Sequence, residues 1–202
     1  MRSRQEFVAE HFRLSREVLD RAAADRELRD DIVAIADAIV IAMRKGGKLL
    51  VAGNGGSAGD AQHIAGEFLS RLNFDRNPLP AIALTTDSSV LTAIGNDYGF
   101  DKVFERQVRG LARPGDILLA ISTSGRSPNI IAALQAARGL GVVTIGFTGS
   151  GERDMNALCD YSLRAPSDST PLMQQIHIIA AHAICGLVEL ELFGSGATAA
   201  AE

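Results

Sequence analysis

The chain has 202 residues, of which 47% are hydrophobic and 22% charged, and its formal net charge is −4 at pH 7. This length suits one domain that folds without disulfides or a structural metal, and the negative charge offers no basic surface for nucleic acid. The sequence shows no signal-peptide pattern and no apolar run of the roughly 20 residues that span a bilayer, and its two cysteines lack metal-ligand spacing, so we expect a soluble, cytoplasmic protein.

Two helices are predicted at the amino-terminal end. Residues 4–24 mix charged side chains with spaced apolar ones. Residues 28–44 carry large aliphatic side chains three or four positions apart, which is the spacing of one helix face. Two consecutive glycines are then expected to end the second helix.

Short aliphatic runs alternate with helix-length segments in the rest of the chain. Continuous apolar runs of this kind are typical of parallel strands that are covered on both faces. The strands are expected at residues 48–52, 81–84, 116–121 and 142–147, with residues 161–164 as the candidate fifth. This alternation predicts an α/β fold with a doubly wound parallel sheet, in which ligands bind beyond the carboxyl ends of the strands.

A final helix is predicted over residues 171–193, with Thr170 as its N-cap and Pro171 in its first turn. The helix is apolar on nearly all sides until Glu189, so it must be buried. A chain of this length has little to cover such a helix, and packing against another copy of the chain is the simplest explanation. We expect a single domain over residues 1–193 and a frayed tail over residues 194–202.

The first predicted strand leads into residues 53–57, Gly-Asn-Gly-Gly-Ser, and then into a helix. Glycines let the backbone approach an anion closely, and a helix N-terminus offers free N–H groups and a positive dipole end. The segment is neither a Walker loop nor a complete dinucleotide-binding fingerprint. Two interpretations remain open at this point, a phosphate-binding loop and a plain capping box formed by Ser57 and Asp60.

The third predicted strand ends in residues 122–127, Ser-Thr-Ser-Gly-Arg-Ser, before Pro128 opens a helix. Ser127 before Pro128 is a common helix cap, but a cap needs one hydroxyl and this segment has four. Hydroxyls together with backbone N–H groups can bind a phosphate monoester without a lysine. The sequence therefore favours phosphate binding here over capping alone.

These two loops resemble those of the SIS domain family, which are sugar isomerase domains that bind phosphosugars, and the resemblance covers nearly the whole chain. Within the family the chain is most similar to the branch that converts sedoheptulose 7-phosphate to D-glycero-D-manno-heptose 7-phosphate. The closer likeness rests on residues 62–67 (QHIAGE), residues 95–100 (GNDYGF), residues 174–177 (QQIH) and His182. The departures, Gly66 in place of a carboxylate of some members and Ser70 in place of glycine, remove no proposed catalytic group.

Candidate chemistry lies on two of the predicted helices. His63 and Glu67 are four residues apart and therefore share a helix face. Most such pairs are exposed polar neighbours, but the phosphate loop just upstream would hold a ligand within their reach. On the final helix, Gln174, His177 and His182 are polar residues among apolar ones and need partners. We interpret His177 as a hydrogen-bonded core histidine and His182 as a functional residue.

The resemblance assigns roles to these residues. An aldose–ketose isomerase moves a proton between C1 and C2 of an open-chain sugar, with a base at carbon and an acid or metal at the oxygens. Glu67 would be the base and His182 the partner acid. One Zn²⁺ per subunit is implied, with the ligands His63, Glu67, Gln174 and His182. The implied substrate contacts are Asn54, Gly55, Gly56, Ser57, Glu67, Arg71, Asn96, Asp97, Ser122, Thr123, Ser124, Ser127 and Gln174.

The family also implies a flavodoxin-like strand order and a homotetramer with a central bundle of amino- and carboxyl-terminal helices. The product would feed heptose into lipopolysaccharide or a related surface glycan. Gln174 and His182 are about 12 Å apart along an ideal helix and about 80° apart around it. We therefore expect either a neighbouring chain to complete the site or a distortion of this helix.

Three other functions remain open at this stage. Residues 80–87 and 90–96 look like a non-catalytic SIS protein that binds the bacterial replication initiator, although that relative lacks equivalents of Glu67 and His182. A module that senses a phosphosugar is usually fused to a second domain, for which this chain has no room. An isomerase for a pentose or hexose 6-phosphate is the third, because the sequence does not reveal the length of the pocket.

Overall fold

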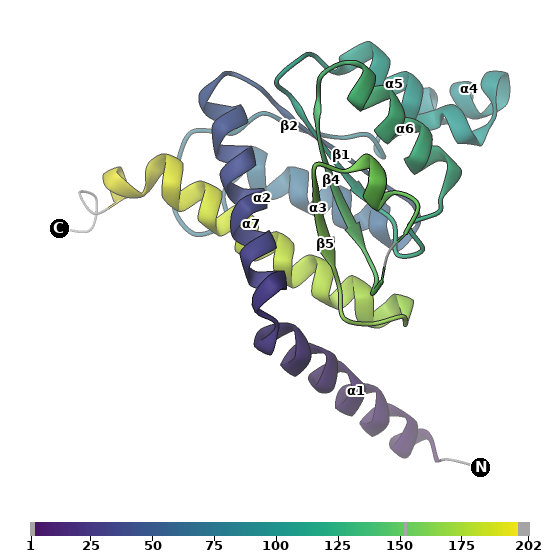
Figure 1. Cartoon of the computed structure of the whole chain (residues 1–202), viewed down its shortest axis with the longest axis vertical. Coiled ribbons are helices and arrows are strands. Elements are labelled where there is room, and N and C mark those ends of the chain that lie inside the picture. Colours follow the sequence, from purple (N-terminus) through teal and green to yellow (C-terminus); the bar gives the residue numbers. More distant parts are fainter. Residues whose placement is uncertain (1–2, 152, 198–202) are drawn as a thin grey trace.

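The computed structural model describes residues 3–151 and 153–197, which form a parallel sheet with helices on both of its faces (Figure 1). The strands are β1 (Leu49–Gly53), β2 (Ala81–Ala83), β3 (Ile117–Ile121), β4 (Val143–Thr148) and β5 (Tyr161–Arg164). The helices are α1 (Arg4–Ala24), α2 (Arg26–Arg44), α3 (Gly56–Leu69), α4 (Ser88–Tyr98), α5 (Val103–Leu111), α6 (Pro128–Gly139) and α7 (Thr170–Ala197). All five predicted strands are present, and each begins and ends within one residue of its expected bounds.

The strand order is β2-β1-β3-β4-β5 with every pair parallel, which confirms the doubly wound, flavodoxin-like prediction. Leu49 of β1 pairs with Ala81 on one side and Ile117 on the other. After β1 the chain crosses to β2 at one edge, and after β3 it continues to β4 in the opposite direction. The carboxyl ends of β1 and β3 therefore flank the point where the strand order reverses, which is where such sheets bind ligands.

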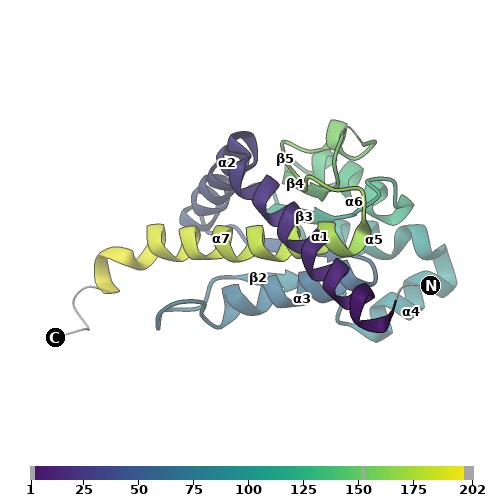
Figure 2. The same cartoon turned by 90° about the horizontal axis from the view of Figure 1, so that it is seen from below.

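The sheet separates two hydrophobic cores. One core joins β1, β3 and β4 to helices α2, α3 and α7, and includes Ile39, Phe68 and Ile176. The other core lies beneath α5 and α6 and includes Phe104 and Leu134. Figure 2 shows α2, α3 and α7 together and α5 and α6 on the far side of the strands. Helices cover both faces of β1 and β3, so every side chain of these strands is buried. This burial explains why their sequences are almost entirely aliphatic.

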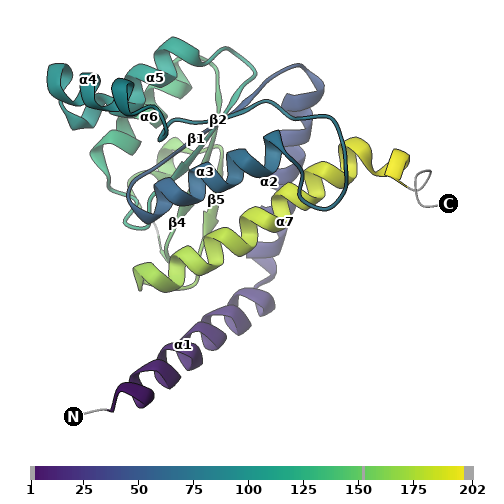
Figure 3. The same cartoon turned by 180° about the vertical axis from the view of Figure 1, so that it is seen from behind.

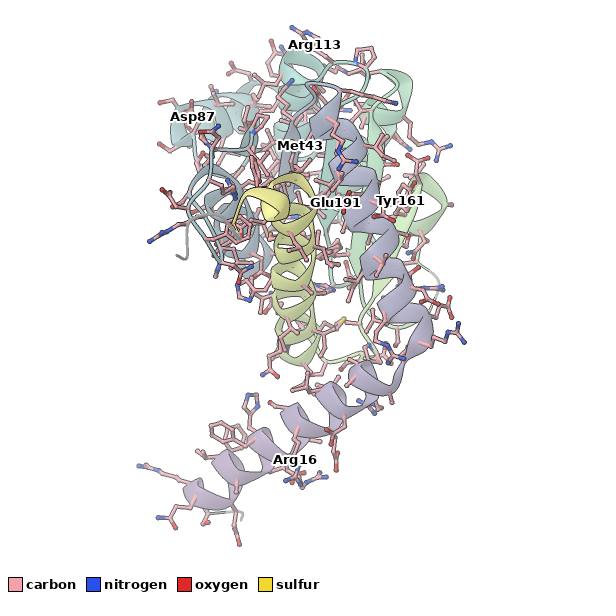
Figure 4. The ribbon with its side chains drawn as sticks, turned by 90° about the vertical axis from the view of Figure 1, so that its left-hand side faces the viewer. Arg16, Met43, Asp87, Arg113, Tyr161 and Glu191 are labelled. Atoms are coloured by element: carbon pink, nitrogen blue, oxygen red, sulfur yellow. The ribbon has the colours of Figure 1, made fainter. Side chains whose placement is uncertain are left out.

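Helix α1 begins with a capping box between Ser3 and Glu6, and most of its length extends away from the sheet (Figure 3). Of the α1 residues that the structure describes, Val18 and Ala22 are buried. Figure 4 shows Arg16 on this projecting helix, well away from the body of the domain.

Helix α7 differs in detail from its prediction. It begins at Thr170, so Thr170 lies inside the first turn and the prediction that it is the N-cap is wrong by one residue. It continues through Ala197, four residues beyond the expected end, and the last part of the predicted tail, residues 198–202, lies outside the described residues. From Thr170 to Gly194 the helix is long and apolar enough to cross a membrane by length and composition alone, contrary to the expectation above. The core helix of a soluble protein meets the same criterion, and α7 packs closely on α2 and α3.

Candidate active site

The glycine-rich turn after β1 is shaped by its glycines. Gly55 has φ +56° and is the N-cap of α3, which begins at Gly56. A Cβ atom at Gly53 would lie 2.4 Å from the carbonyl oxygen of Ser57, so only glycine fits this close turn. No side chain caps the helix, and Ser57 is buried within its first turn, so the alternative of a capping box from Ser57 to Asp60 is wrong. The open N-terminus of α3 is suited to binding an anion.

The hydroxyl-rich loop after β3 gathers its side chains at the start of α6. The Oγ atom of Ser122 lies 3.0 Å from that of Ser127 and 3.4 Å from that of Ser124. Ser127 occupies the N-cap position as predicted, but its hydroxyl makes no capping bond to the helix. Thr123 is half-buried in the same loop, and Gly125 closes the turn with φ +63°. Three converging hydroxyls at a helix N-terminus are suited to a phosphate group.

A pair of amides joins the two loops. Asn54 Nδ2 donates to Asn129 Oδ1 at 2.9 Å, and Asn129 Nδ2 donates to Asn54 Oδ1 at 2.8 Å. Asn129 is buried in the first turn of α6. Sequence reasoning missed this residue, whose only signal is its place directly after a helix-starting proline. The loops after β1 and β3 therefore form one unit.

His63, Glu67 and His182 meet within a single chain. His63 Nε2 lies 3.0 Å from Glu67 Oε1 and 3.1 Å from His182 Nε2. The two imidazole rings meet edge to face, with centroids 5.0 Å apart. The expected meeting of α3 with His182 thus occurs without a neighbouring chain, and we call these three residues the His–Glu–His cluster.

The His–Glu–His cluster fits a divalent cation. Its three ligand atoms all lie within 4.8 Å of one another. Four-coordinate zinc with bonds of about 2.0–2.1 Å separates its ligand atoms by about 3.3 Å, close to two of the spacings observed here. A neutral histidine Nε2 either donates or accepts, so His63 Nε2 cannot form full hydrogen bonds with both neighbours. A shared cation would satisfy all three atoms at once.

Gln174 lies near the N-terminal ends of α3 and α7. A Cβ atom at Gly56 would lie 2.4 Å from Gln174 Nε2, so this amide rests against the first turn of α3. Because His182 meets His63 further along, α3 and α7 run side by side between the two contacts (Figure 3). Helix α7 is unbroken from Gln174 to His182. The role of Gln174 as a ligand stays a prediction.

Three predicted substrate contacts lie outside the His–Glu–His cluster. Arg71 is exposed and follows the end of α3 at Leu69. Asn96 and Asp97 are exposed at the end of α4, where Asn96 Nδ2 donates to Asp97 Oδ1 at 2.8 Å. Among the described residues, no hydrogen bond or ion pair joins these three side chains to the cluster. Their roles in substrate binding stay predictions.

His177 is the core histidine that the sequence predicts. Its Nε2 lies 2.9 Å from the carbonyl oxygen of Thr148, and its ring packs against Phe147. Burial lowers the pKa of His177, although the bond to Thr148 acts in the opposite direction. A neutral ring in the core explains this histidine without a catalytic role.

Comparison with known proteins identifies clear relatives. Residues 10–149, more than half of the chain, match the SIS domain family. A phosphoheptose isomerase of Bradyrhizobium sp. (strain ORS 278) is 58% identical over 185 residues, which are 92% of this chain and 93% of that protein. A phosphoheptose isomerase of Aneurinibacillus thermoaerophilus is 47% identical over 188 residues, which are 93% and 95% of the two chains.

Solved structures give the same result. The phosphoheptose isomerase of Neisseria gonorrhoeae aligns with a TM-score of 0.86 and 42% identity, over 93% of this chain and 99% of that one. The phosphoheptose isomerase of Francisella tularensis aligns with a TM-score of 0.89 and 36% identity, over 93% and 98% of the two chains.

Proposed function

The chain belongs to the SIS domain family, and on this basis we propose that it is an aldose–ketose isomerase that converts sedoheptulose 7-phosphate to D-glycero-D-manno-heptose 7-phosphate. Relatives named phosphoheptose isomerase match it over more than nine-tenths of its length. The observation that carries the proposal is the meeting of Glu67 and His182 in the His–Glu–His cluster.

The two loops at the carboxyl ends of β1 and β3, residues 53–57 and 122–127, would hold the phosphate, and we call them the phosphate loops. The hydroxyls of Ser122, Ser124 and Ser127 and the N-termini of α3 and α6 are donors of the kind that a phosphate monoester accepts. The Asn54–Asn129 pair keeps the two loops in one arrangement. A substrate anchored there by its phosphate would place the other end of its carbon chain along α3.

Proton transfer then falls to Glu67 and His182. Glu67 removes a proton from C1 of the open-chain ketose, which leaves an enediol, and returns the proton to C2. His182 protonates the oxygen at C2 as the enediol forms, and the hydroxyl at C1 then gives its proton back to His182, so that the aldehyde forms at C1. Since Glu67 Oε1 faces His63, the second carboxylate oxygen is the one left to accept the carbon-bound proton.

We also propose a zinc ion held by the His–Glu–His cluster and Gln174. Bound there, zinc would supply positive charge that stabilises the enediol oxygens. His63 Nε2 lies 3.0 Å from Glu67 Oε1, so the ring of His63 orients one carboxylate oxygen of Glu67. The proposal further includes a cytoplasmic location, a homotetramer and a product that serves as a heptose precursor.

The alternative of a non-catalytic scaffold that binds the replication initiator is not favoured. Such a protein would need neither Glu67 nor His182, yet the two side chains converge at α3, the helix that begins at the glycine-rich turn. A sensing module without turnover is disfavoured for the same reason.

The test is an assay of the purified chain with sedoheptulose 7-phosphate, in which the aldose product is followed over time. Glu67→Gln keeps the shape of the side chain but removes the base, and we expect kcat to fall about 10²- to 10⁴-fold. Glu105→Gln is the matched control, because Glu105 lies on α5, away from the His–Glu–His cluster, and forms ion pairs with Lys102 and Arg109. No turnover by the wild type, or full activity of Glu67→Gln, would contradict the proposal.

A further inference from the structure

A fully buried ion pair lies at the end of α3 that is remote from the phosphate loops. Arg76 is in the segment after α3 and Glu189 is in α7, and their side chains are 3% and 0% exposed. Arg76 Nε donates to Glu189 Oε1 at 3.0 Å. Removing two charges from water costs about as much free energy as their attraction returns, so a buried ion pair contributes little net stability. The presence of this pair therefore needs a reason other than stability.

Arg76 binds the backbone of α3, the helix that carries Glu67. Its Nη2 donates to the carbonyl oxygen of Glu67 at 2.7 Å, and its Nη1 donates to the carbonyl oxygen of Phe68 at 2.8 Å. These are among the last carbonyls of α3, which ends at Leu69, and they have no partner within the helix. A guanidinium group at a helix C-terminus also interacts favourably with the helix dipole. Arg76 therefore fixes the turn that carries Glu67.

Glu189 connects this turn to α7. Besides Arg76, its carboxylate accepts from Leu72 N at 3.1 Å and from Asn73 N at 2.8 Å. Glu189 follows His182 by seven residues, close to two full turns, so both lie on the same face of α7. The segment after α3 that contains Asn73 lies close to this face of α7, since a Cβ atom at Gly186 would lie 3.3 Å from Asn73 Nδ2.

We propose that Arg76 and Glu189 are positioning residues that set the distance between α3 and α7 at which Glu67 faces His182. The inference rests on the proposed function, because it assigns to the pair a role in the geometry of that reaction. A misplacement of about 1 Å can lower a rate about 10²-fold even when the change lies away from the reacting atoms.

Arg76→Lys is the main test variant. It keeps the positive charge, but the compact ammonium group cannot bond Glu189 and the carbonyls of α3 with the planar fork of arginine. At a temperature where circular dichroism shows the variant folded, we expect kcat to fall about 10- to 100-fold while KM changes less than about twofold. The phosphate loops, which set much of the substrate affinity, are not touched.

Asp116→Asn is the matched control. Asp116 is also buried in an ion pair, with Lys48 Nζ at 2.5 Å, but this pair lies before β1 and β3, at the opposite ends of the strands from the site. We expect Asp116→Asn to lower the melting temperature without changing kcat. If Arg76→Lys behaves in the same way, the pair is structural only and the proposal is wrong.

A second measurement separates this proposal from the proposed function. The chain has four histidines, so ring signals of His63 and His182 can be followed by NMR without any substrate. Both signals should shift in Arg76→Lys and stay unchanged in Asp116→Asn. Unshifted signals would overturn the positioning role even if the wild type proved inactive on heptose phosphates, and shifted signals would support it in that case.

If Arg76→Lys does not fold, the double variant Arg76→Met with Glu189→Leu removes both charges and keeps the core apolar. It should fold with kcat still reduced at least tenfold, because the carbonyl oxygen of Glu67 loses its partner. Wild-type kcat in this folded double variant would overturn the proposal.

Discussion

The surroundings of single side chains separate His177, the core histidine of α7, from His182, to which we assign a function. His177 is 1% exposed, its Nε2 is satisfied by Thr148, and its Nδ1 is buried without a hydrogen-bond partner among the described residues. His182, five residues later, is half-buried and faces His63. Five residues turn a helix by about 140°, so the two rings point to different neighbours.

The buried state of His177 predicts a dependence of stability on pH. Burial lowers its pKa in the folded chain, so as the pH falls through the ordinary titration range of histidine, the unfolded chain binds a proton more readily than the folded chain. The free energy of unfolding should therefore fall as the pH drops below about 6.5, by at most about 1.4 kcal/mol per pH unit from this group. In His177→Gln this part of the loss should be absent.

The measurement is denaturant unfolding of the wild type and His177→Gln at pH 7.5 and pH 5.5. His11→Gln is the control, because His11 is exposed on α1, away from the core that surrounds His177. Equal losses of stability in the wild type and His177→Gln would show that His177 does not contribute.

At the scale of elements, the proposed site needs Gln174 of α7 to lie against the first turn of α3. A substitution at Gly56 tests this contact. In Gly56→Ala the new methyl group would meet the Gln174 amide, the flexible end of a side chain that can move at little cost in stability. We expect the chain to stay folded while activity falls about as far as in Gln174→Ala. Since both changes remove the same amide, the double variant should lose no more than either single one.

Gly59→Ala is the control for this prediction, because a Cβ atom there meets nothing within 4 Å on the same helix. Its activity and stability should match those of the wild type. Additive losses in the double variant would show that Gln174 does not act where the structure places it.

The elements also show what the sequence can predict. The strands follow from continuous aliphatic runs, and the i, i+4 spacing places His63 beside Glu67, because both signals are local. The position of Gly55 as N-cap is missed because a positive φ begins α3 earlier than the favoured capping residue suggests. The Asn54–Asn129 and Arg76–Glu189 pairs join residues 75 and 113 positions apart, and no sequence period marks such contacts. The approach of His182 to α3 depends on the packing of helices and is likewise not encoded locally.

At the scale of the whole molecule, α1 and α7 expose large apolar side chains. Phe7 and Phe12 on α1 are 67% and 71% exposed, and Leu190 on α7 is also exposed. Apolar surface on a projecting helix is typical of an interface between proteins. Because Glu67 and His182 already meet within one chain, this surface is better explained by assembly than by the need to bring these two residues together.

If the homotetramer proposed above assembles through α1, the double variant Phe7→Ser with Phe12→Ser should dissociate it. Neither phenylalanine belongs to the core, so each chain should keep its helical content while sedimentation velocity shows smaller species. Arg16→Ser, a change to an exposed polar residue of the same helix, should leave the tetramer intact because it adds no cost to burying the aromatic rings. Sedimentation of the wild type as a monomer at every concentration would exclude the tetramer, and an intact tetramer in the double variant would place its interface away from these phenylalanines.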